Sequence, residues 1–272
     1  MPDFTPFRTD TDTAGPTVTA SATAVLSPAA PAAVTPEDGA RSPVFAYLPK
    51  PTMIDFEGHL SFLVFLSGCN FRCGFCHNAA LMAERQAGLS WKRVRDACAH
   101  LRQTAWITGV VISGGEPTLH AELPELIRFF KSQGLAVKLD SNGSQPEILE
   151  QLLPEVDAVA MDIKCRPDRY PDFVGWARPD AIRQSVQLLL RQNRVQVEFR
   201  TTVLPEIHTP EEMRAIGTLL AGARNYTLQP FHPRHDLPDP ALRTRERTPK
   251  GLLLTLAEQL KREFALPVQV RG

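Results

Sequence analysis

The stretch that decides the fold is residues 61–78, SFLVFLSGCNFRCGFCHN. Its first six residues, Ser61–Leu66, form a continuous apolar run, which is typical of a strand buried on both faces of a parallel sheet. The run leads directly into a loop that carries Cys69, Cys73 and Cys76. Parallel α/β folds place their active sites at the carboxyl ends of the strands, so this loop stands where chemistry is expected if the rest of the chain has that fold.

Short apolar runs recur along the chain, with helical patterns between them. Further strands are expected at 110–112, 135–139, 156–161, 195–203 and 226–229. Ser90 is a candidate N-cap, and Thr209-Pro210-Glu211-Glu212 has the order of a capping box with proline at the first helical position. Six strands joined by helical crossovers predict right-handed βαβ units, in either an open doubly wound sheet or a full or partial barrel.

Composition excludes several classes of protein. The 272 residues include 30 Lys and Arg and 30 Asp and Glu, so a basic nucleic-acid footprint is not indicated. Five clustered cysteines are too few for a disulfide scaffold. No apolar run approaches the roughly 18 residues that span a bilayer. We therefore expect a cytoplasmic protein that binds neither nucleic acid nor membrane.

The beginning of the chain differs in composition from the rest. Nine of the 24 prolines fall within the first 51 residues, and residues 1–45 show no sustained apolar period. Such a segment buries too little apolar surface to offset its ordering entropy. Its acidic residues outnumber its two arginines, unlike a transit peptide, and it lacks the apolar core of a secretory signal. We expect a disordered extension over 1–50 and one catalytic domain over 51–272.

The CxxxCxxC loop is the strongest chemical signal. Thiolates suit zinc or iron–sulfur clusters, and a cluster held by three cysteines leaves one iron open for catalysis. A structural zinc site would need to borrow His77, Cys98 or Cys165, but the sequence offers no second ligand pair.

Residues 73–77 also match the CxxCH string for c-type haem, which requires export and leaves Cys69 unexplained. A redox pair of Cys73 and Cys76 is a further alternative. The iron–sulfur cluster accounts for all three thiols and is the interpretation we favour.

Polar groups also follow each of the other predicted strands. In Ser113-Gly114-Gly115-Glu116-Pro117, the glycines are expected to bring backbone N–H groups close to a ligand, and Glu116 offers a carboxylate to a cationic amine. The later strand ends carry Asp140-Ser141-Asn142-Gly143, Met161-Asp162-Ile163-Lys164, Arg200-Thr201-Thr202 and Gln229-Pro230-Phe231-His232. Parallel strands bring such ends together, so a polar ligand is expected there.

Taken together, these strings resemble the radical S-adenosylmethionine (radical SAM) superfamily. The cysteine loop with Phe75 before its last cysteine, followed by Gly-Gly-Glu-Pro, carries the resemblance. Longer strings resemble the activating proteins of anaerobic ribonucleoside-triphosphate reductase, a group of glycyl-radical-enzyme activases. These strings are GCNFRCGFCHN (68–78), VISGGEPT (111–118), VKLDSNG (137–143), VAMDIK (159–164) and FRTTV (199–203).

The resemblance implies a partial (β/α)6 barrel with two cofactors. Cys69, Cys73 and Cys76 would ligate a 4Fe-4S cluster whose fourth iron holds S-adenosylmethionine. Gly114, Gly115 and Glu116 would bind its methionine amino group. Asp140, Ser141 and Asp162 would surround its carboxylate, together with a monovalent cation. The remaining cofactor-binding residues carried over in this way are Phe75, Lys164, Arg200, Thr202 and His232.

The activity implied is reductive cleavage of S-adenosylmethionine and hydrogen abstraction from a glycine Cα of a partner enzyme. The expected partner is an anaerobic ribonucleotide reductase, with a flavodoxin or ferredoxin as electron donor. Alternatives within the class are activation of another glycyl radical enzyme, such as pyruvate formate-lyase, or a small-molecule radical SAM reaction. A zinc- or haem-binding module without enzymatic activity is the alternative from a different class.

Overall fold

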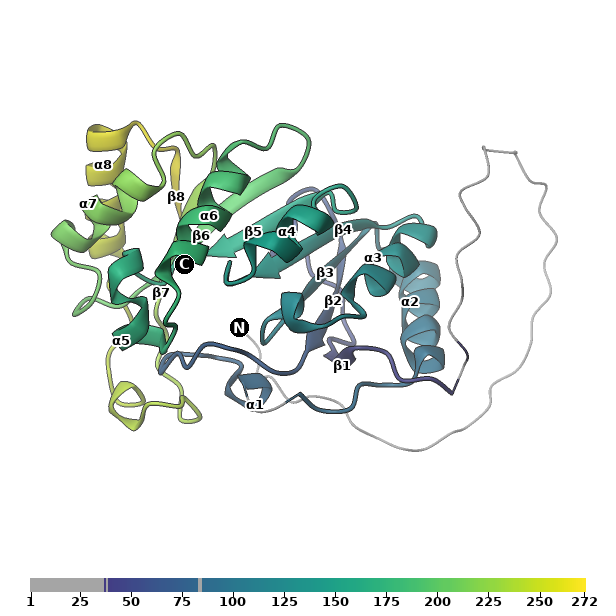
Figure 1. Cartoon of the computed structure of the whole chain (residues 1–272). Helices are drawn as coiled ribbons and strands as arrows, with labels where there is room; N and C mark the ends of the chain where they lie inside the picture. Colours follow the sequence, from purple (N-terminus) through teal and green to yellow (C-terminus); the bar gives the residue numbers. More distant parts are fainter. Residues whose placement is uncertain (1–36, 38, 83–84) are drawn as a thin grey trace.

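The computed structural model describes residues 37, 39–82 and 85–272. These residues build one eight-stranded sheet whose strand order follows the sequence from β1 to β8 (Figure 1). β1 pairs with β2 in antiparallel fashion, and every later neighbour is parallel. The strands are β1 Val44–Tyr47, β2 Ser61–Leu66, β3 Gly109–Gly114, β4 Ala136–Ser141, β5 Ala158–Asp162, β6 Gln196–Val203, β7 Tyr226–Pro230 and β8 Val268–Val270.

Helices connect successive parallel strands, and two of them begin at the predicted caps. The Ser90 hydroxyl accepts a hydrogen bond from the Arg93 N–H, and the Thr209 hydroxyl accepts one from the Glu212 N–H. The helices are α1 Ala79–Met82, α2 Trp91–Ala105, α3 Leu123–Ser132, α4 Pro146–Leu152, α5 Tyr170–Val174, α6 Pro179–Leu190, α7 Pro210–Leu219 and α8 Lys250–Phe264. Short 3-10 turns lie at Pro117–Leu119, Pro167–Arg169 and Pro240–Leu242.

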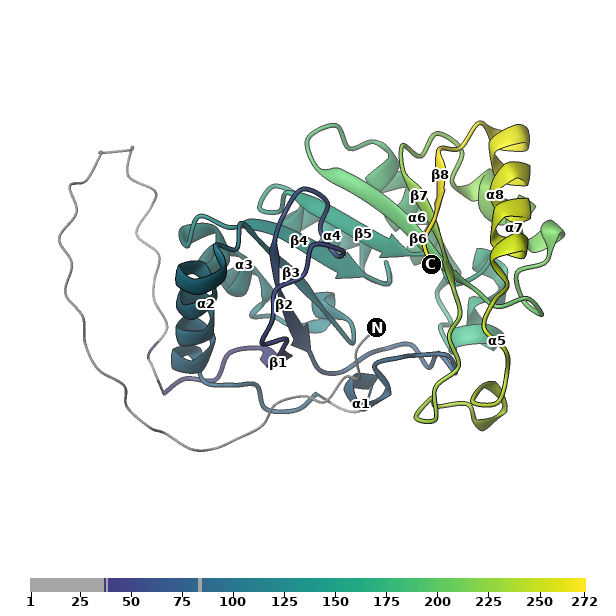
Figure 2. The ribbon, with the colours of Figure 1, turned by 180° about the vertical axis from the view of Figure 1, so that it is seen from behind.

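The strand order decides between the two expected architectures. A doubly wound sheet reverses its strand order at a switch point, and this sheet does not. Right-handed crossovers without a reversal place all the connecting helices on one face, and the sheet curls away from them. Seen from behind, the sheet has β1 at one edge and β8 at the other (Figure 2). The expected α/β fold is confirmed, in the form of a partial barrel.

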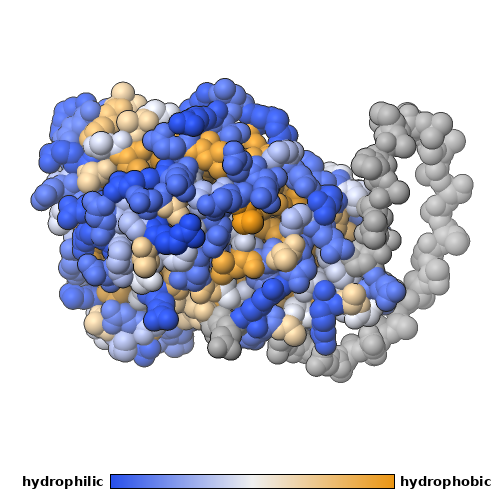
Figure 3. Space-filling view, viewed as in Figure 1, coloured by the Kyte–Doolittle hydropathy of each residue, from blue (hydrophilic) through white to orange (hydrophobic). Residues whose placement is uncertain are grey.

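The buried core consists of two clusters, one on each face of the curved sheet. Alternate strand residues such as Val64, Ile112 and Leu139 are fully buried in the large cluster beneath the helices. Residues of the opposite parity, including Leu63, Phe65 and Val111, form a smaller cluster on the inner face. Outside the core the surface is mostly hydrophilic, with apolar residues gathered near the middle of one face (Figure 3).

Two edge strands correct the sequence prediction. The folded domain was expected to begin at residue 51, but β1 lies before that position and pairs with β2 from Val44 to Tyr47. Residues 1–36 and 38, most of the expected disordered extension, lie outside the described residues. β8 was also missed. Both strands have only three or four residues, too few for a periodic pattern to register.

Among the described residues, no helix is both long and apolar enough to cross a membrane.

Candidate active site

The cysteine loop leaves the carboxyl end of β2 and is anchored by the segment around α5. The buried Phe71 ring packs against Tyr170 and Trp176, with ring centroids 5.8 and 5.6 Å away. The Arg72 N–H donates to the Val174 carbonyl at 2.8 Å. These contacts fix the chain between Cys69 and Cys73, so the thiols are presented from an ordered loop.

Burial dominates the electrostatics of the thiols. Desolvation raises the pKa of Cys69 to about 11 and that of Cys73 to about 12, and it also raises the pKa of Cys76. The positive charge of Lys164 lowers all three without overcoming the burial. The free thiols therefore stay protonated at neutral pH, and a bound metal centre must displace their protons.

Lys164 connects the cysteine loop to the carboxylates of the sheet. Its ammonium lies 5.7 Å from the centroid of Phe75, whose ring stacks on Phe173 at 5.4 Å. The same ammonium is 3.0 Å from a carboxylate oxygen of Asp162. Lys164 thus links Phe75 to Asp162, and all three are predicted site residues.

Arg200 joins the carboxylates of two neighbouring strands. The register of β5 and β6 places Asp162 opposite Arg200. The guanidinium lies 2.9 Å from Asp162 Oδ1 and 3.2 Å from Asp140 Oδ2. Burial raises the pKa of Asp162, but the charges of Arg200 and Lys164 outweigh it and lower the value to about 2. The group is fully ionised at neutral pH.

The backbone of the Gly-Gly-Glu turn bonds to the neighbouring strand and loop. The N–H groups of Gly115 and Glu116 donate to the carbonyls of Leu66 and Gly68, each at 2.8 Å. A Cβ on Gly115 would lie 2.0 Å from the Gly68 oxygen. The glycines therefore let this turn pack against the start of the cysteine loop. The N–H groups of Gly115 and Glu116 are thus used by the neighbouring backbone, and ligand binding by this turn stays a prediction.

The Glu116 carboxylate is fully buried and serves as a junction between strand ends. It accepts hydrogen bonds from the Thr118 N–H at 3.1 Å, the Thr118 hydroxyl at 2.6 Å, the Ser141 hydroxyl at 2.9 Å and the Asn142 N–H at 2.6 Å. Desolvation raises its pKa, and these four donors act in the opposite direction. Most of the acceptor capacity of Glu116 is therefore used within the protein. The binding of an amino group by Glu116 stays a prediction.

The other predicted residues are less closely connected. Thr202 lies on β6 opposite Gln229 of β7, two residues beyond Arg200 and on the same face. The His232 side chain is exposed, and its backbone carbonyl accepts a hydrogen bond from His77 Nε2 at 2.9 Å. Ser113, which was not predicted, donates to Asp140 at 3.3 Å. Asn142, which was quoted within a polar strand end but not assigned a site role, lies beside Cys69.

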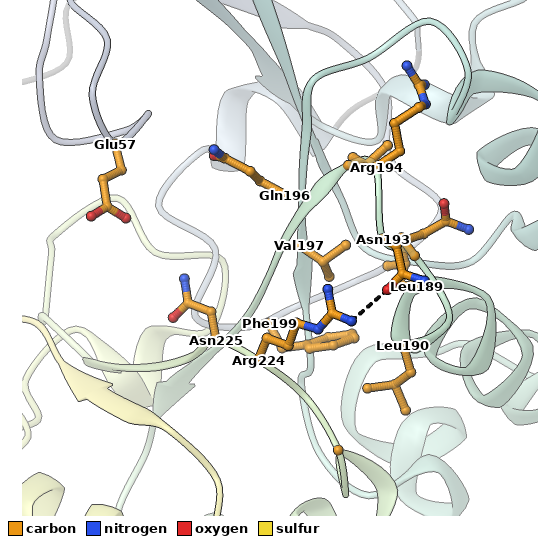
Figure 4. Close-up of a pocket in the computed structure, with 13 residues that line it drawn as sticks. Glu57, Leu189, Leu190, Asn193, Arg194, Gln196, Val197, Phe199, Arg224 and Asn225 are labelled. Carbon is orange, nitrogen blue, oxygen red and sulfur yellow. Dashed lines mark hydrogen bonds between the residues drawn. The ribbon is translucent and has the colours of Figure 1, made fainter.

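A pocket of about 500 Å³ opens at the opposite end of the sheet. It lies around the amino end of β6, and its lining includes Glu57, Gln196 and Asn225 (Figure 4). In the wall of this pocket, the Arg224 guanidinium donates a hydrogen bond to Asn193 Oδ1 at 2.6 Å. None of the predicted site residues lines this pocket. Parallel α/β sheets carry their chemistry at the carboxyl ends of the strands, so the candidate active site remains with the cysteine loop.

The three cysteines fit an iron–sulfur cluster by their chemistry and surroundings. They are three thiols on one partly buried loop beside a lysine whose charge favours thiolates. In the described part of the chain, no three or more His, Cys, Asp or Glu side chains are arranged to hold a single metal ion. A cluster needs no such convergence, because each thiolate binds a different iron.

Comparisons with known proteins identify the class. The sequence profile of the radical SAM superfamily matches residues 63–219, and the chain belongs to this superfamily, whose members use a 4Fe-4S cluster and S-adenosylmethionine.

Its relatives in sequence are activating enzymes of glycyl radical enzymes. The chain is 35% identical over 189 residues to a Methanocaldococcus jannaschii protein named "Putative glycyl-radical enzyme activating enzyme", covering 66% of this chain and 77% of that protein. It is 36% identical over 199 residues to the pyruvate formate-lyase-activating enzyme of Listeria monocytogenes, covering 64% of this chain and 75% of the relative.

Solved structures share the fold. The Streptococcus suis SuiB structure bound to its precursor peptide SuiA aligns with a TM-score of 0.59 at 16% identity, over 83% of this chain and 50% of that one. TYW1 with a lysine-pyruvate adduct aligns with a TM-score of 0.56 at 17% identity, over 75% and 73% of the two chains.

Proposed function

We propose that this protein generates a glycyl radical on a partner enzyme by abstracting hydrogen from a glycine Cα. The observation that carries the proposal is the meeting of the cysteine loop with Lys164, Asp162 and Arg200 at the carboxyl end of the sheet. This arrangement puts a metal-binding loop beside charged groups of both signs, as a zwitterionic ligand such as S-adenosylmethionine requires.

Each element of the site has a proposed task. Cys69, Cys73 and Cys76 hold the cluster, which supplies the electron for cleaving the sulfonium C–S bond of S-adenosylmethionine. Lys164 and Arg200 keep Asp162 ionised, so that this carboxylate, near the methionine carboxylate of the ligand, offers a fixed negative charge to the monovalent cation. The apolar Phe75 and Phe173 stack excludes water from one side of the site.

Further binding roles belong to the same proposal. The turn Gly114-Gly115-Glu116 would lie at the methionine amino end, and Asp140 and Ser141 at the carboxylate. A monovalent cation would accompany them. Thr202 and His232 would contribute at the edges of the ligand.

The partner that we propose is an anaerobic ribonucleoside-triphosphate reductase. The supporting observation is the set of sequence strings at the strand ends, from GCNFRCGFCHN to FRTTV. A second candidate is a pyruvate formate-lyase, favoured by the 36% identity to the Listeria activating enzyme. An electron donor of the flavodoxin or ferredoxin kind would serve either reaction.

Electron paramagnetic resonance tests the function and separates the two partners. The reduced, cluster-loaded protein is mixed anaerobically with S-adenosylmethionine and either enzyme, and the glycyl radical doublet is recorded. We expect a doublet with the reductase, and none when Cys73→Ala replaces the wild type. A doublet with pyruvate formate-lyase alone would reassign the partner, and no doublet with either enzyme would reject the proposed partners.

A further inference from the structure

The Asn142 side chain points from the strand-end turn after β4 toward the cysteine loop. Its Nδ2 lies 3.9 Å from Cys69 Sγ and 2.9 Å from Asn70 Oδ1. The orientation of the amide is fixed, because its Oδ1 accepts from the Ser144 backbone N–H at 2.9 Å and an N–H can only donate. The NH2 end, not the oxygen, therefore faces the sulfur.

The turn that carries Asn142 is held on every side. The Asn142 N–H donates to Glu116 at 2.6 Å, and the Ser141 hydroxyl donates to the same carboxylate at 2.9 Å. From α6, the Ser185 hydroxyl donates to the Gly143 carbonyl at 2.7 Å. Gly143 has φ +75, and a Cβ there would lie 2.0 Å from the Met161 methyl group. The amide is thus preorganised and buried, with Asn142 only 6% exposed.

Asn70 completes the network from the other side. Its Oδ1 accepts from Asn142, and its Nδ2 donates to the Ser144 hydroxyl at 2.8 Å. A backbone donor is also present, since the Phe71 N–H lies 3.4 Å from Cys69 Sγ. Cys69 therefore receives one donor from its own loop and one from a different strand end.

We propose that Asn142 is a positioning residue that sets the reduction potential of the cluster through its N–H donation to Cys69. Hydrogen bonds to cluster sulfurs are among the main determinants of cluster potential. One-electron reduction adds negative charge to the cluster and its thiolates, and the positive end of an N–H dipole stabilises that charge. Asn142 thereby makes the cluster easier to reduce. The inference rests on the proposed assignment of Cys69 as a cluster ligand.

The test measures the midpoint potential of the reconstituted cluster by redox titration, without partner enzyme or S-adenosylmethionine. We expect Asn142→Ala to disfavour reduction about tenfold, a fall of about 59 mV for a one-electron couple. Asn142→Asp keeps the shape but replaces the donor with a negative charge, so its fall should be larger. Ser144→Ala is the matched control: it removes a buried hydroxyl of the network and leaves Asn142 and the Ser144 N–H in place.

Iron content accompanies each titration. Asn142→Ala with four irons and a wild-type potential would overturn the inference, as would an equal fall in Ser144→Ala. If Asn142→Ala holds no cluster, the midpoint potential of the isosteric Asn142→Asp is measured instead, and a wild-type potential in that variant would overturn the inference. Loss of iron in both, with retention in Ser144→Ala, would assign Asn142 to cluster assembly and overturn the tuning role. Failure of glycyl radical formation would leave these outcomes unaffected.

Discussion

The two faces of strands β4 to β6 have opposite chemistry although they belong to the same strands. On the outer face, residues such as Leu139, Met161 and Phe199 are apolar and pack beneath the helices. On the inner face, β4 to β6 carry Lys138, Asp140, Asp162, Glu198 and Arg200, joined by ion pairs. The outer face supplies hydrophobic stability, and the inner face supplies a charged lining for the site.

Small residues make the inner network possible. Ala160 lies between Asp140 and Glu198 in the register, and Ala158 lies between Lys138 and Gln196. An alanine on the central strand leaves space for long side chains from both neighbours. This division of labour between the faces gives four predictions, which run from the largest expected effect to the smallest.

Removal of one thiol at the carboxyl end should abolish the metal centre. Cys73→Ala leaves two ligands for three irons, so we expect loss of the cluster, measured as bound iron and visible absorption after anaerobic reconstitution. Cys98→Ala is the control, because Cys98 is also buried but belongs to α2, on the outer side of the sheet. A full complement of iron in Cys73→Ala, or its loss in Cys98→Ala, would contradict the assignment.

Truncation on the outer face should cost stability without changing the site. Phe199 is buried under the helices, and Phe199→Ala is expected to lower the free energy of unfolding by about 3–5 kcal/mol. Thr202→Ala, on the inner face of the same strand, should cost less than about 1 kcal/mol. Urea denaturation of the two variants measures the difference. Equal losses would show that the faces do not divide stability and chemistry as described.

Removal of the inner-face arginine should lower the free energy of unfolding, because two largely buried carboxylates lose their cationic partner. Arg200→Gln leaves Asp140 and Asp162 without their shared partner, and we expect a loss of about 3 kcal/mol at pH 7.

The same variant should also change how the free energy of unfolding depends on pH in acid. Asp162 is ionised in the folded protein down to about pH 2, against an ordinary pKa of 3.8. Its stabilising effect is therefore present above pH 3.8 and is lost as the pH falls toward 2. Arg200→Gln should flatten the rise of unfolding free energy with pH in that range. An unchanged slope would mean that Arg200 does not hold the Asp162 pKa down.

The smallest effect is expected at His208, which links the loops after β5 and β6. Nδ1 accepts from the Leu204 N–H at 2.9 Å, and Nε2 donates to the Lys164 carbonyl at 3.0 Å. Burial lowers its pKa from the ordinary 6.5. The unfolded chain thus binds a proton that the folded state resists, so stability is retained above pH 6.5 and declines below it.

His208→Gln should flatten the decline of melting temperature between pH 6.5 and 5. His235→Gln, at an exposed position, is the control for replacing an imidazole with an amide. A wild-type slope in His208→Gln would assign the pH dependence to other groups.

Most of the fold was predictable because its central strands are long enough to show a pattern. All six predicted strands, from Ser61–Leu66 to Tyr226–Pro230, are present. The edge strands β1 and β8 were not, since three or four residues carry no period. The inner-face network had a signal that was not used: polar residues two apart, as at Lys138 and Asp140 or at Glu198 and Arg200, indicate one polar face of a strand.

The site was only partly predictable. Spacing revealed the three cysteines, because all lie on one loop. The contact between Asn142 and Cys69 joins residues 73 positions apart, and Asn-Gly has a sufficient explanation as a turn. Likewise, no local pattern shows that the N–H groups of Gly115 and Glu116 donate to β2 and its following loop. Such contacts depend on how strand ends converge, which only the fold determines.

The contacts between the cysteine loop and the segment after β7 have a consequence for synthesis of the protein. His77 bonds the carbonyl of His232, 155 residues later, and the Asp239 N–H donates to Gly74 at 3.0 Å. At about 5–20 residues per second, the ribosome synthesises the segment around His232 roughly 8–30 seconds after the cysteine loop. During that interval the segment that contacts the cysteine loop is still absent. The nascent cysteines are therefore more accessible to oxidants or to an iron–sulfur donor than they are in the finished fold.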